Sequence, residues 1–292
     1  MLRKVIFVLS LLITVFTLAG CFNLEQPVNQ PIEPTTPAPR SEQLKVHFID
    51  VGQADCILVQ MPNEQNMLID AGNNDDGDAV VSYLRKEGVR QIDYLVGTHP
   101  HEDHIGGMDT VIKSFNIGQV YLPKATHNTK TYEDVLLAVK AKRLNITPAK
   151  AGVQIINSGG LSAVMLAPNA DSYEDLNNYS TVIKVNFDKV SFLFTGDAEK
   201  QSEFEMMAKS APGLGADVLK VGHHGSNSST TPAFLRAVYP QYAVICVGAG
   251  NDYGHPHREV LQRLRGLKVY RTDMDGTIVF TTDGKEISVI TR

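Results

Sequence analysis

The residues best suited to chemistry are three histidines and an aspartate within six consecutive positions, in the segment His99-Pro100-His101-Glu102-Asp103-His104. This segment follows an apolar run, residues 92–96, that predicts a strand. Side chains alternate along an extended chain, so His99 and His101 are expected to point the same way. Nitrogen and carboxylate donors at this density favour zinc or a similar divalent metal, because calcium and magnesium prefer oxygen ligands. With only 9 histidines in 292 residues, a chance cluster in a polar loop is the weaker interpretation.

Other apolar runs also deliver polar residues at their ends. The segments concerned are Phe48-Ile49-Asp50-Val51-Gly52-Gln53-Ala54-Asp55, Thr195-Gly196-Asp197, His223-His224-Gly225-Ser226 and Tyr253-Gly254-His255-Pro256-His257. In this order around His99-x-His101-x-Asp103-His104, they resemble the ComEC-type hydrolase domain of the metallo-β-lactamase superfamily, over residues 44–292. The resemblance implies an α+β fold, an αββα sandwich of two mixed β-sheets with external helices. It also implies a dinuclear metal site at the edge of that sandwich.

The resemblance assigns roles to individual residues. Two divalent ions are implied, with zinc favoured and manganese as the alternative, and Asp197 would bridge them. Adjacent histidines diverge, so of His223 and His224 one should bind metal and the other should meet substrate; we assign them in that order and leave the reverse open. His255 is the rival for the last ligand, or else a loop histidine bonded to the backbone. The implied metal ligands are His99, His101, Asp103, His104, Asp197 and His223, and the implied catalytic residues are His224, His255 and Asn178.

One departure from the family pattern concerns a histidine that many members carry between the first motif and the aspartate. Here that region reads Leu176-Asn177-Asn178-Tyr179-Ser180 and contains no histidine. An amide is a poor zinc ligand, so the first ion would be held by His99, His101, Asp197 and solvent. Asn178 is then expected to hydrogen-bond substrate or bound water.

Two further aspartates are candidates for supporting the ligands. Asp70 ends the apolar run 66–70, and Asp50 follows the run 44–49. A carboxylate there can accept the free N–H of a ligand imidazole and fix its tautomer. The alternative for both is a carboxylate that caps a turn.

The N-terminus has the pattern of an exported lipoprotein. Residues 1–20 combine a short basic start with an apolar run of a length typical of a signal-peptide core, ending in Leu18-Ala19-Gly20-Cys21, which resembles the bacterial lipobox. Cys21 is then the lipidated mature N-terminus, and an ordinary secreted protein is the alternative. Residues 21–43 are rich in proline and polar residues and predict an extended tether. The expected location is extracytoplasmic, with a lipid anchor in the cell membrane.

Charge and cysteine content set weaker limits. The net charge is -5, and no long lysine or arginine run occurs, which counts mildly against tight nucleic-acid binding. Cys56 and Cys246 lie in apolar strand-like runs, where buried free thiols are favoured over a disulfide or a metal ligand.

The hydrophobic pattern predicts strands and helices that alternate in both halves of residues 44–292. The strands are expected at 44–50, 55–60, 66–70, 92–97, 119–122, 153–156, 161–166, 181–187, 190–195, 217–221, 243–247, 268–271, 277–281 and 286–290, and the helices at 78–87, 108–115, 132–142, 199–209, 232–238 and 257–265. This order fits two packed sheets with helices outside.

These observations predict a metal-dependent hydrolase that acts through a metal-activated hydroxide. A phosphodiester is the first choice of substrate, either DNA or a cell-wall polymer, and the resemblance adds a competence-type membrane partner. One alternative is a β-lactam or thioester hydrolase. The other is a non-catalytic surface receptor that binds DNA or wall polymer.

Overall fold

The period-two pattern of apolar residues explains the layering of the protein. We describe a computed structural model of residues 43–210 and 213–292. In strands β1 (Leu44–Phe48) and β2 (Ile57–Gln60), Val46 and Ile57 face one way and pack into a core between two sheets. Leu58 faces the other way and packs beneath helices. The first sheet is therefore apolar on both faces.

The first sheet is mixed and contains eight strands in the described residues, in the order β15-β14-β1-β2-β3-β4-β5-β6. Strands β3, β4, β5 and β6 are parallel to one another, whereas β15, β14, β1, β2 and β3 pair with their neighbours in that order in antiparallel fashion. The remaining bounds are β3 Asn66–Ile69, β4 Gln91–Val96, β5 Asn116–Pro123, β6 Ile146–Ala149, β14 Ile278–Thr282 and β15 Ile287–Thr291.

The second sheet is also mixed, with seven strands in the described ranges in the order β13-β12-β11-β10-β9-β8-β7. Its parallel part consists of β10, β11, β12 and β13. The bounds are β7 Gln154–Ser158, β8 Leu161–Ala167, β9 Val182–Phe187, β10 Val190–Phe194, β11 Val218–Lys220, β12 Tyr242–Ile245 and β13 Lys268–Arg271.

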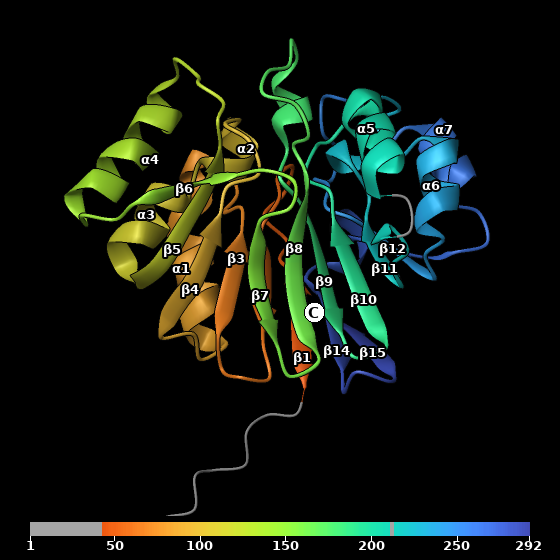
Figure 1. Cartoon of the computed structure of the whole chain (residues 1–292), viewed down its shortest axis with the longest axis horizontal. Helices are drawn as coiled ribbons and strands as arrows, with labels where there is room; N and C mark the ends of the chain where they lie inside the picture. The colour runs from red at the N-terminus through yellow and green to blue at the C-terminus, as the bar shows by residue number, and fades with distance from the viewer. Residues whose placement is uncertain (1–42, 211–212) are drawn as a thin grey trace, which may run out of the picture. The chain divides into compact units, whose positions relative to one another are not determined.

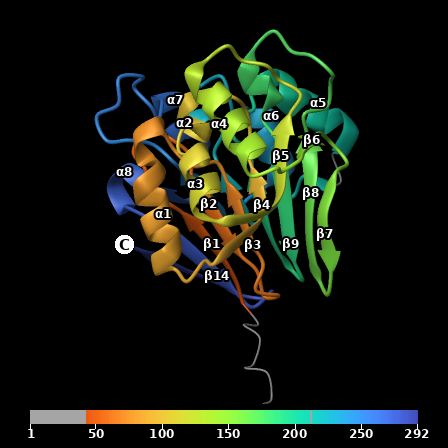
Figure 2. The same ribbon diagram turned by 90° about the vertical axis from the view of Figure 1, so that its left-hand side faces the viewer.

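Helices cover the outer face of each sheet (Figures 1 and 2). Apolar residues of α1, α3 and α4 pack on the first sheet, and those of α5, α6 and α7 pack on the second. The helices are α1 Gly77–Lys86, α2 Glu102–Ile105, α3 Met108–Ser114, α4 Lys130–Ala141, α5 Lys200–Ser210, α6 Pro232–Val238, α7 Arg258–Arg263 and α8 Thr272–Asp275, with single 3₁₀ turns η1 Asn74–Asp76, η2 Leu176–Tyr179 and η4 His223–Gly225.

The predicted αββα sandwich of two mixed sheets is confirmed, and the predicted strands and longer helices lie within a few residues of the observed ones. Strand β6 was not predicted, because its sequence Ile-Thr-Pro-Ala contains a proline and only weak apolar alternation. Proline is tolerated there because β6 is the edge strand of its sheet. Both Cys56 and Cys246 are buried free thiols, as predicted.

The predicted signal segment 1–20, the lipidation site Cys21 and almost all of the tether 21–43 lie outside the described residues. Those expectations therefore remain predictions. Among residues 43–210 and 213–292, no helix has the length and apolar character needed to span a bilayer.

Candidate metal centre

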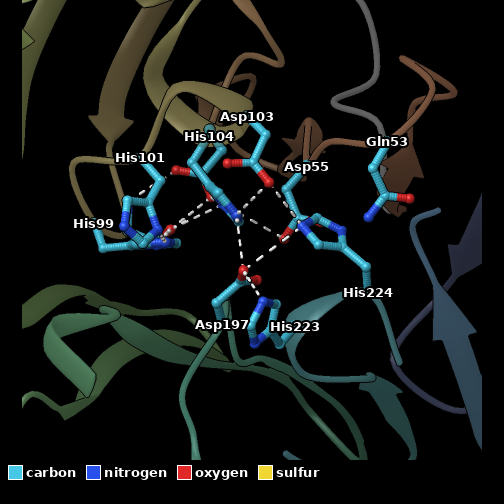
Figure 3. A network of polar contacts seen from close by, with 12 residues as sticks. Gln53, Asp55, His99, His101, Asp103, His104, Asp197, His223 and His224 are labelled. Atoms are coloured by element: carbon cyan, nitrogen blue, oxygen red, sulfur yellow. Dashed lines mark hydrogen bonds and ion pairs between the residues drawn. The ribbon is translucent and has the colours of Figure 1, made fainter. Parts of the chain in front are cut away.

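The polar residues of interest lie just beyond the carboxyl ends of strands in both sheets. Asp70 follows β3 and His99 follows β4, and these two strands are parallel neighbours. Asp197 follows β10 and His223 follows β11, which are parallel neighbours in the other sheet. Parallel neighbours end at the same edge of their sheet. Side chains from the two sheets meet there: His99, Asp197 and His223 lie close together (Figure 3), and Asp70 contacts His104.

Glycines allow these segments to approach closely. A Cβ at Gly106 would lie 2.3 Å from backbone atoms of the Asn73–Asn74 turn, and one at Gly107 would lie 2.4 Å from the carbonyl oxygen of Ala71. The backbones therefore approach one another closely at Gly106 and Gly107. This approach holds the segment that carries Asp103 and His104 against the end of β3.

Four donor atoms converge at this edge, one each from Asp103, His104, Asp197 and His224, all within 4.8 Å of one another. The Nε2 atom of His104 is 3.3 Å from Oδ2 of Asp197, and Nε2 of His224 is 3.6 Å from the same oxygen. Oδ2 of Asp103 lies 3.1 Å from Nε2 of His224. We call these four residues the four-donor cluster.

Two atoms of the four-donor cluster lack a hydrogen bond within the described part of the chain, although both are buried. They are Nε2 of His104 and Oδ1 of Asp197. Buried polar atoms are ordinarily satisfied, so these two require a partner. Two imidazoles and two carboxylates are a donor set that suits zinc or manganese. The residues therefore fit the divalent metal that the sequence predicts.

The other ring nitrogens of this cluster are anchored by the protein. Nδ1 of His104 donates to Oδ2 of Asp70 at 2.8 Å, and Nδ1 of His224 donates to the carbonyl oxygen of Cys246 at 2.8 Å. These bonds assign the proton to Nδ1 and leave Nε2 as a donor to metal. Asp70 in turn accepts the amide and the hydroxyl of Thr98, each at 2.7 Å. Asp70 thus occupies the supporting place expected of it.

His99 and His101 form a second group beside the first. Nε2 of His99 lies 2.9 Å from Nδ1 of His101, and the ring centroids of His99 and His104 are 4.2 Å apart. The hydroxyl of Ser180 lies 3.4 Å from Nδ1 of His99 and accepts the amide of Asp197 at 3.0 Å. Ser180 therefore joins the two halves of the site, in the region that lacks the family's additional histidine.

A buried lysine balances the carboxylates and was not foreseen. Lys220 is 0% exposed, and its Nζ lies 2.7 Å from Oδ2 of Asp55 and 3.8 Å from Oδ1 of Asp197. Nζ also donates to the carbonyl oxygen of Gly196 at 3.0 Å. Burial lowers the pKa of Lys220, but Asp55 and Asp197 outweigh this effect and raise it above its usual value. A lysine inside the apolar run 217–222 was the signal available in the sequence.

Electrostatics separate the histidines of the site. Burial opposes a charge on His104, but Asp197, Asp103 and Asp70 raise its pKa well above the usual range. The pKa of His99 is lowered well below its usual value, mainly by burial and then by the charge of His104. Burial and the neighbouring histidines lower the pKa of His255 to about 4. His255 is therefore neutral near pH 7.

The two adjacent histidines lie in different surroundings. His224 is buried in the four-donor cluster, whereas His223 is partly exposed, with Nε2 3.6 Å from Oδ2 of Asp197 and Nδ1 3.3 Å from Oε1 of Glu199. Both have left-handed backbone conformations, with φ of 47° and 51°, which are costly outside glycine and concentrate at functional sites. The two rings diverge, with centroids 6.1 Å apart and planes at 72°, an arrangement that the sequence does not reveal.

Two predicted residues do not reach the cluster. Asp50 is exposed, and its Oδ1 accepts the amide of Gly52 at 3.2 Å, so it caps a turn. The buried carboxylate beside His224 is that of Asp55, whose Oδ1 lies 3.5 Å from Nδ1 of His224 and whose Oδ2 pairs with Lys220. The side-chain oxygen of Asn178 accepts the amide of Ser202 at 3.1 Å, at the start of α5.

A cavity of about 330 Å³ opens onto the four-donor cluster. His101 and Asp103 line one side, and His223, His224 and His255 line the other. Asn177 lines this cavity, whereas Asn178 does not. Four of the expected site histidines, His101, His223, His224 and His255, therefore face one space, which is large enough for a substrate group to reach the cluster. His99 and His104 do not line it.

Comparison with known proteins identifies the fold and the family. A family profile described as the metallo-beta-lactamase superfamily matches residues 49–249. Among solved structures, the metallo-beta-lactamase fold protein YhfI from Bacillus subtilis superposes with a TM-score of 0.54 at 12% identity, covering 85% of this chain and 99% of that one. CmlA from Streptomyces venezuelae, described as a diiron beta-hydroxylase, superposes with a TM-score of 0.51 at 14% identity, covering 85% of this chain and 55% of that one.

Curated relatives share more sequence. ComE operon protein 3 of Bacillus subtilis is 34% identical over 259 residues, which covers 82% of this chain and 33% of the relative. Competence protein ComA of Neisseria gonorrhoeae is 33% identical over 79% of this chain and 31% of its own length. Recombination protein 2 of Haemophilus influenzae is 30% identical over 80% of this chain and 28% of its own length. The chain thus spans about a third of the length of these relatives.

Proposed function

Because this chain belongs to the metallo-beta-lactamase superfamily, whose members are metal-dependent hydrolases, we propose that it hydrolyses a phosphodiester outside the cytoplasmic membrane. The observation that carries this proposal is the four-donor cluster, in which Nε2 of His104 and Oδ1 of Asp197 are buried without a hydrogen bond in the described residues. The cluster opens on a cavity large enough for a phosphate and its neighbours.

We assign one divalent ion to Asp103, His104, Asp197 and His224, and a second to His99, His101 and Asp197. Zinc is the first choice because imidazole nitrogen predominates, and manganese is the alternative. When bound, such ions would bring the pKa of water toward neutrality and offset negative charge on a phosphoryl group. His255, with its low pKa and a buried Nδ1 that lacks a partner in the described residues, remains the rival ligand.

The residues around the cavity supply the rest of the chemistry. His223 is partly exposed at the cavity, and Glu199 holds its Nδ1 at 3.3 Å, so that Nε2 faces Asp197 and the substrate space. We assign it the role of giving a proton to the leaving oxygen. Asn177 lines the cavity, and its Oδ1 is buried without a hydrogen bond in the described part, so it takes the substrate-binding role first expected of Asn178.

Substrate and location are proposed from the relatives and the N-terminal sequence. One relative is named a competence protein and another a recombination protein, and both names support a DNA strand as substrate. The first also supports a competence-type membrane partner. A cell-wall phosphodiester polymer is the second choice within the same chemistry. The lipobox-like sequence ending at Cys21 supports a lipid anchor on the outer side of the cell membrane.

A direct assay distinguishes this proposal from its alternatives. The full chain, loaded with zinc or manganese, is tested on bis-p-nitrophenyl phosphate, single-stranded DNA and nitrocefin. We expect turnover of the first two and none of the third. Cleavage of nitrocefin alone would indicate a β-lactam hydrolase, and no turnover with either metal would indicate a receptor. In the same assay His101→Ala should remove both metal and turnover, and unaltered turnover would count against this site.

A further inference from the structure

Two loops from opposite ends of the chain build one wall of the cavity. Gln53 comes from the segment before β2, and Tyr253 comes from the segment after β12. Oε1 of Gln53 accepts the amide of Gly248 at 3.1 Å. A Cβ at Gly248 would lie 2.6 Å from the backbone nitrogen of Gln53, so only glycine allows this approach. The two loops are therefore held together at the mouth of the cavity.

A single asparagine fixes the shape of the second loop. Nδ2 of Asn251 donates to the carbonyl oxygens of Gly248 at 2.9 Å and His255 at 2.7 Å. Its Oδ1 accepts the amides of Tyr253 at 3.2 Å and His255 at 3.0 Å. Four hydrogen bonds thus hold the backbone around Tyr253 before any substrate arrives. A preordered loop loses little entropy when it binds a ligand.

Tyr253 extends a series of nearly parallel rings from the four-donor cluster to the rim. The rings of His224 and His255 are stacked, with centroids 6.4 Å apart and planes at 25°. The rings of His255 and Tyr253 are stacked at 5.7 Å and 22°. Tyr253 nevertheless remains 68% exposed. The protein therefore presents a large, rigid aromatic surface to solvent at the entrance of the site.

The charge of the cavity limits how a strand could be held. The residues that line the cavity include the acids Glu102 and Asp103. Within the described residues, no lysine or arginine lines it. The cavity therefore offers no cationic groove to backbone phosphates that lie outside the metal centre. Such a groove is the usual source of affinity for nucleic acid. Stacking of bases on aromatic side chains is the other general source of affinity for nucleic acid, and it is available to every base because each base has a flat aromatic face.

We propose that Tyr253 stacks against a nucleobase of a nucleic-acid strand whose scissile phosphodiester lies at the four-donor cluster. The inference rests on the proposed phosphodiesterase function and identifies its substrate as a polymer with bases. Gln53 lies beside His224, with its side-chain nitrogen on the side of that ring (Figure 3), so it can donate a hydrogen bond to the same nucleotide. Tyr253 and Gln53 then select the substrate, while the metal ligands perform the chemistry.

The test compares the full, metal-loaded chain with Tyr253→Ala, Tyr253→Phe and Tyr239→Ala. Tyr239 is 88% exposed at the end of α6 and serves as the control for losing an exposed tyrosine. The substrates are a fluorescein-labelled oligothymidylate and an oligomer of the same length built from abasic nucleotides. Tyr253→Ala should raise KM for oligothymidylate by between about five- and a hundred-fold, the range for loss of one stacked base. KM for the abasic oligomer should not change, and Tyr253→Phe should behave like wild type because its ring remains.

Binding is measured separately by fluorescence anisotropy with the metal-free chain. Tyr253→Ala should weaken binding of oligothymidylate and leave the abasic oligomer unaffected, whereas Tyr239→Ala should change neither.

Three outcomes would overturn the inference. If the wild type cleaves oligothymidylate and Tyr253→Ala changes neither KM nor binding, stacking is wrong and the phosphodiesterase proposal stands. If Tyr253→Ala affects both oligomers equally, its effect is structural. If the wild type prefers the abasic oligomer, the occupant is a polymer without bases, such as a wall polymer. If the wild type cleaves no phosphodiester, the proposed function fails, and a base-dependent loss of binding would still support the stacking contact.

Discussion

Two buried histidines, one in strand β1 and one in helix α2, show how a structural imidazole differs from one that binds metal. His47 and His104 are both 0% exposed. Both ring nitrogens of His47 have protein partners: Nδ1 lies 2.8 Å from the hydroxyl of Tyr83, and Nε2 lies 3.1 Å from Oε1 of Gln60. Only Nδ1 of His104 is bonded in the described residues, and its Nε2 faces Asp197.

Charge separates the two histidines in the same way. Burial lowers the pKa of His47 to about 4, so this ring is neutral near pH 7. Its two hydrogen bonds satisfy both ring nitrogens. Burial also opposes a charge on His104, but three aspartates raise its pKa well above the usual value. Burial alone therefore does not mark a functional histidine. A functional histidine is marked by a buried ring nitrogen that has no hydrogen bond and is surrounded by acidic side chains.

The largest expected effect is the loss of metal and activity when the unpaired nitrogen is removed. His104→Ala should lower kcat/KM by more than about 100-fold, the upper end of what supporting residues around a metal usually cost. His47→Gln is the matched control, because it alters an equally buried ring and should leave metal content unchanged. Metal analysis and phosphodiesterase rates measure both. Equal losses in the two variants would remove the distinction drawn between these histidines.

The second effect concerns the charge balance beneath the four-donor cluster. Lys220→Met leaves Asp55 buried without its cation, which should cost about 3–5 kcal/mol of the free energy of unfolding. Lys113→Met, in an exposed pair with Asp109, should change stability little. Urea unfolding of the metal-free chain gives both values. A small loss for Lys220→Met would mean that the buried pair contributes little to the fold.

A smaller effect is expected when only the support of His104 is weakened. Asp70→Asn keeps the size of the side chain but reduces its power to accept the Nδ1 proton at 2.8 Å. Metal affinity should fall by about 10- to 100-fold, as is typical for such partners. Competition with a chromophoric chelator measures the change. An unaltered metal affinity would show that Asp70 stabilises the turn at Thr98 and does not support His104 as a metal ligand.

The smallest effect is a pH dependence of stability that arises at His47. Its pKa is about 4 in the folded chain and near 6.5 when unfolded, so the unfolded state binds more protons between these values. The stabilisation is fully present above pH 6.5 and is lost as the pH falls toward 4. Between pH 7 and pH 5 the loss should be about 1–2 kcal/mol. Urea unfolding of the metal-free chain should show that His47→Leu reduces this loss, and an unchanged pH profile would contradict the assignment.

Much of the fold could be predicted from the sequence, because apolar runs and their polar ends are local properties. Asp70, Asp197 and the histidines after β4 and β11 lie at strand ends, as expected. Convergence depends on register and backbone conformation, which are not local. The left-handed backbone at His223 and His224 determines which ring turns inward.

The missed residues have a similar explanation. Asp55 lies in the segment before β2 of the first sheet and Lys220 lies in β11 of the second, so their contact at 2.7 Å exists only once the sheets have packed. The choice between Asn177 and Asn178 depends on a 3₁₀ turn, which directs one amide to the cavity and the other to the start of α5.

The most direct test of the metal centre is the metal content of the full chain purified without added metal. Inductively coupled plasma analysis should find about two equivalents of zinc or manganese in the wild type, and the content should drop sharply in His104→Ala but not in His47→Gln. A wild-type chain that contains neither ion and takes up neither on addition would contradict the account, as would a His104→Ala chain with the wild-type content.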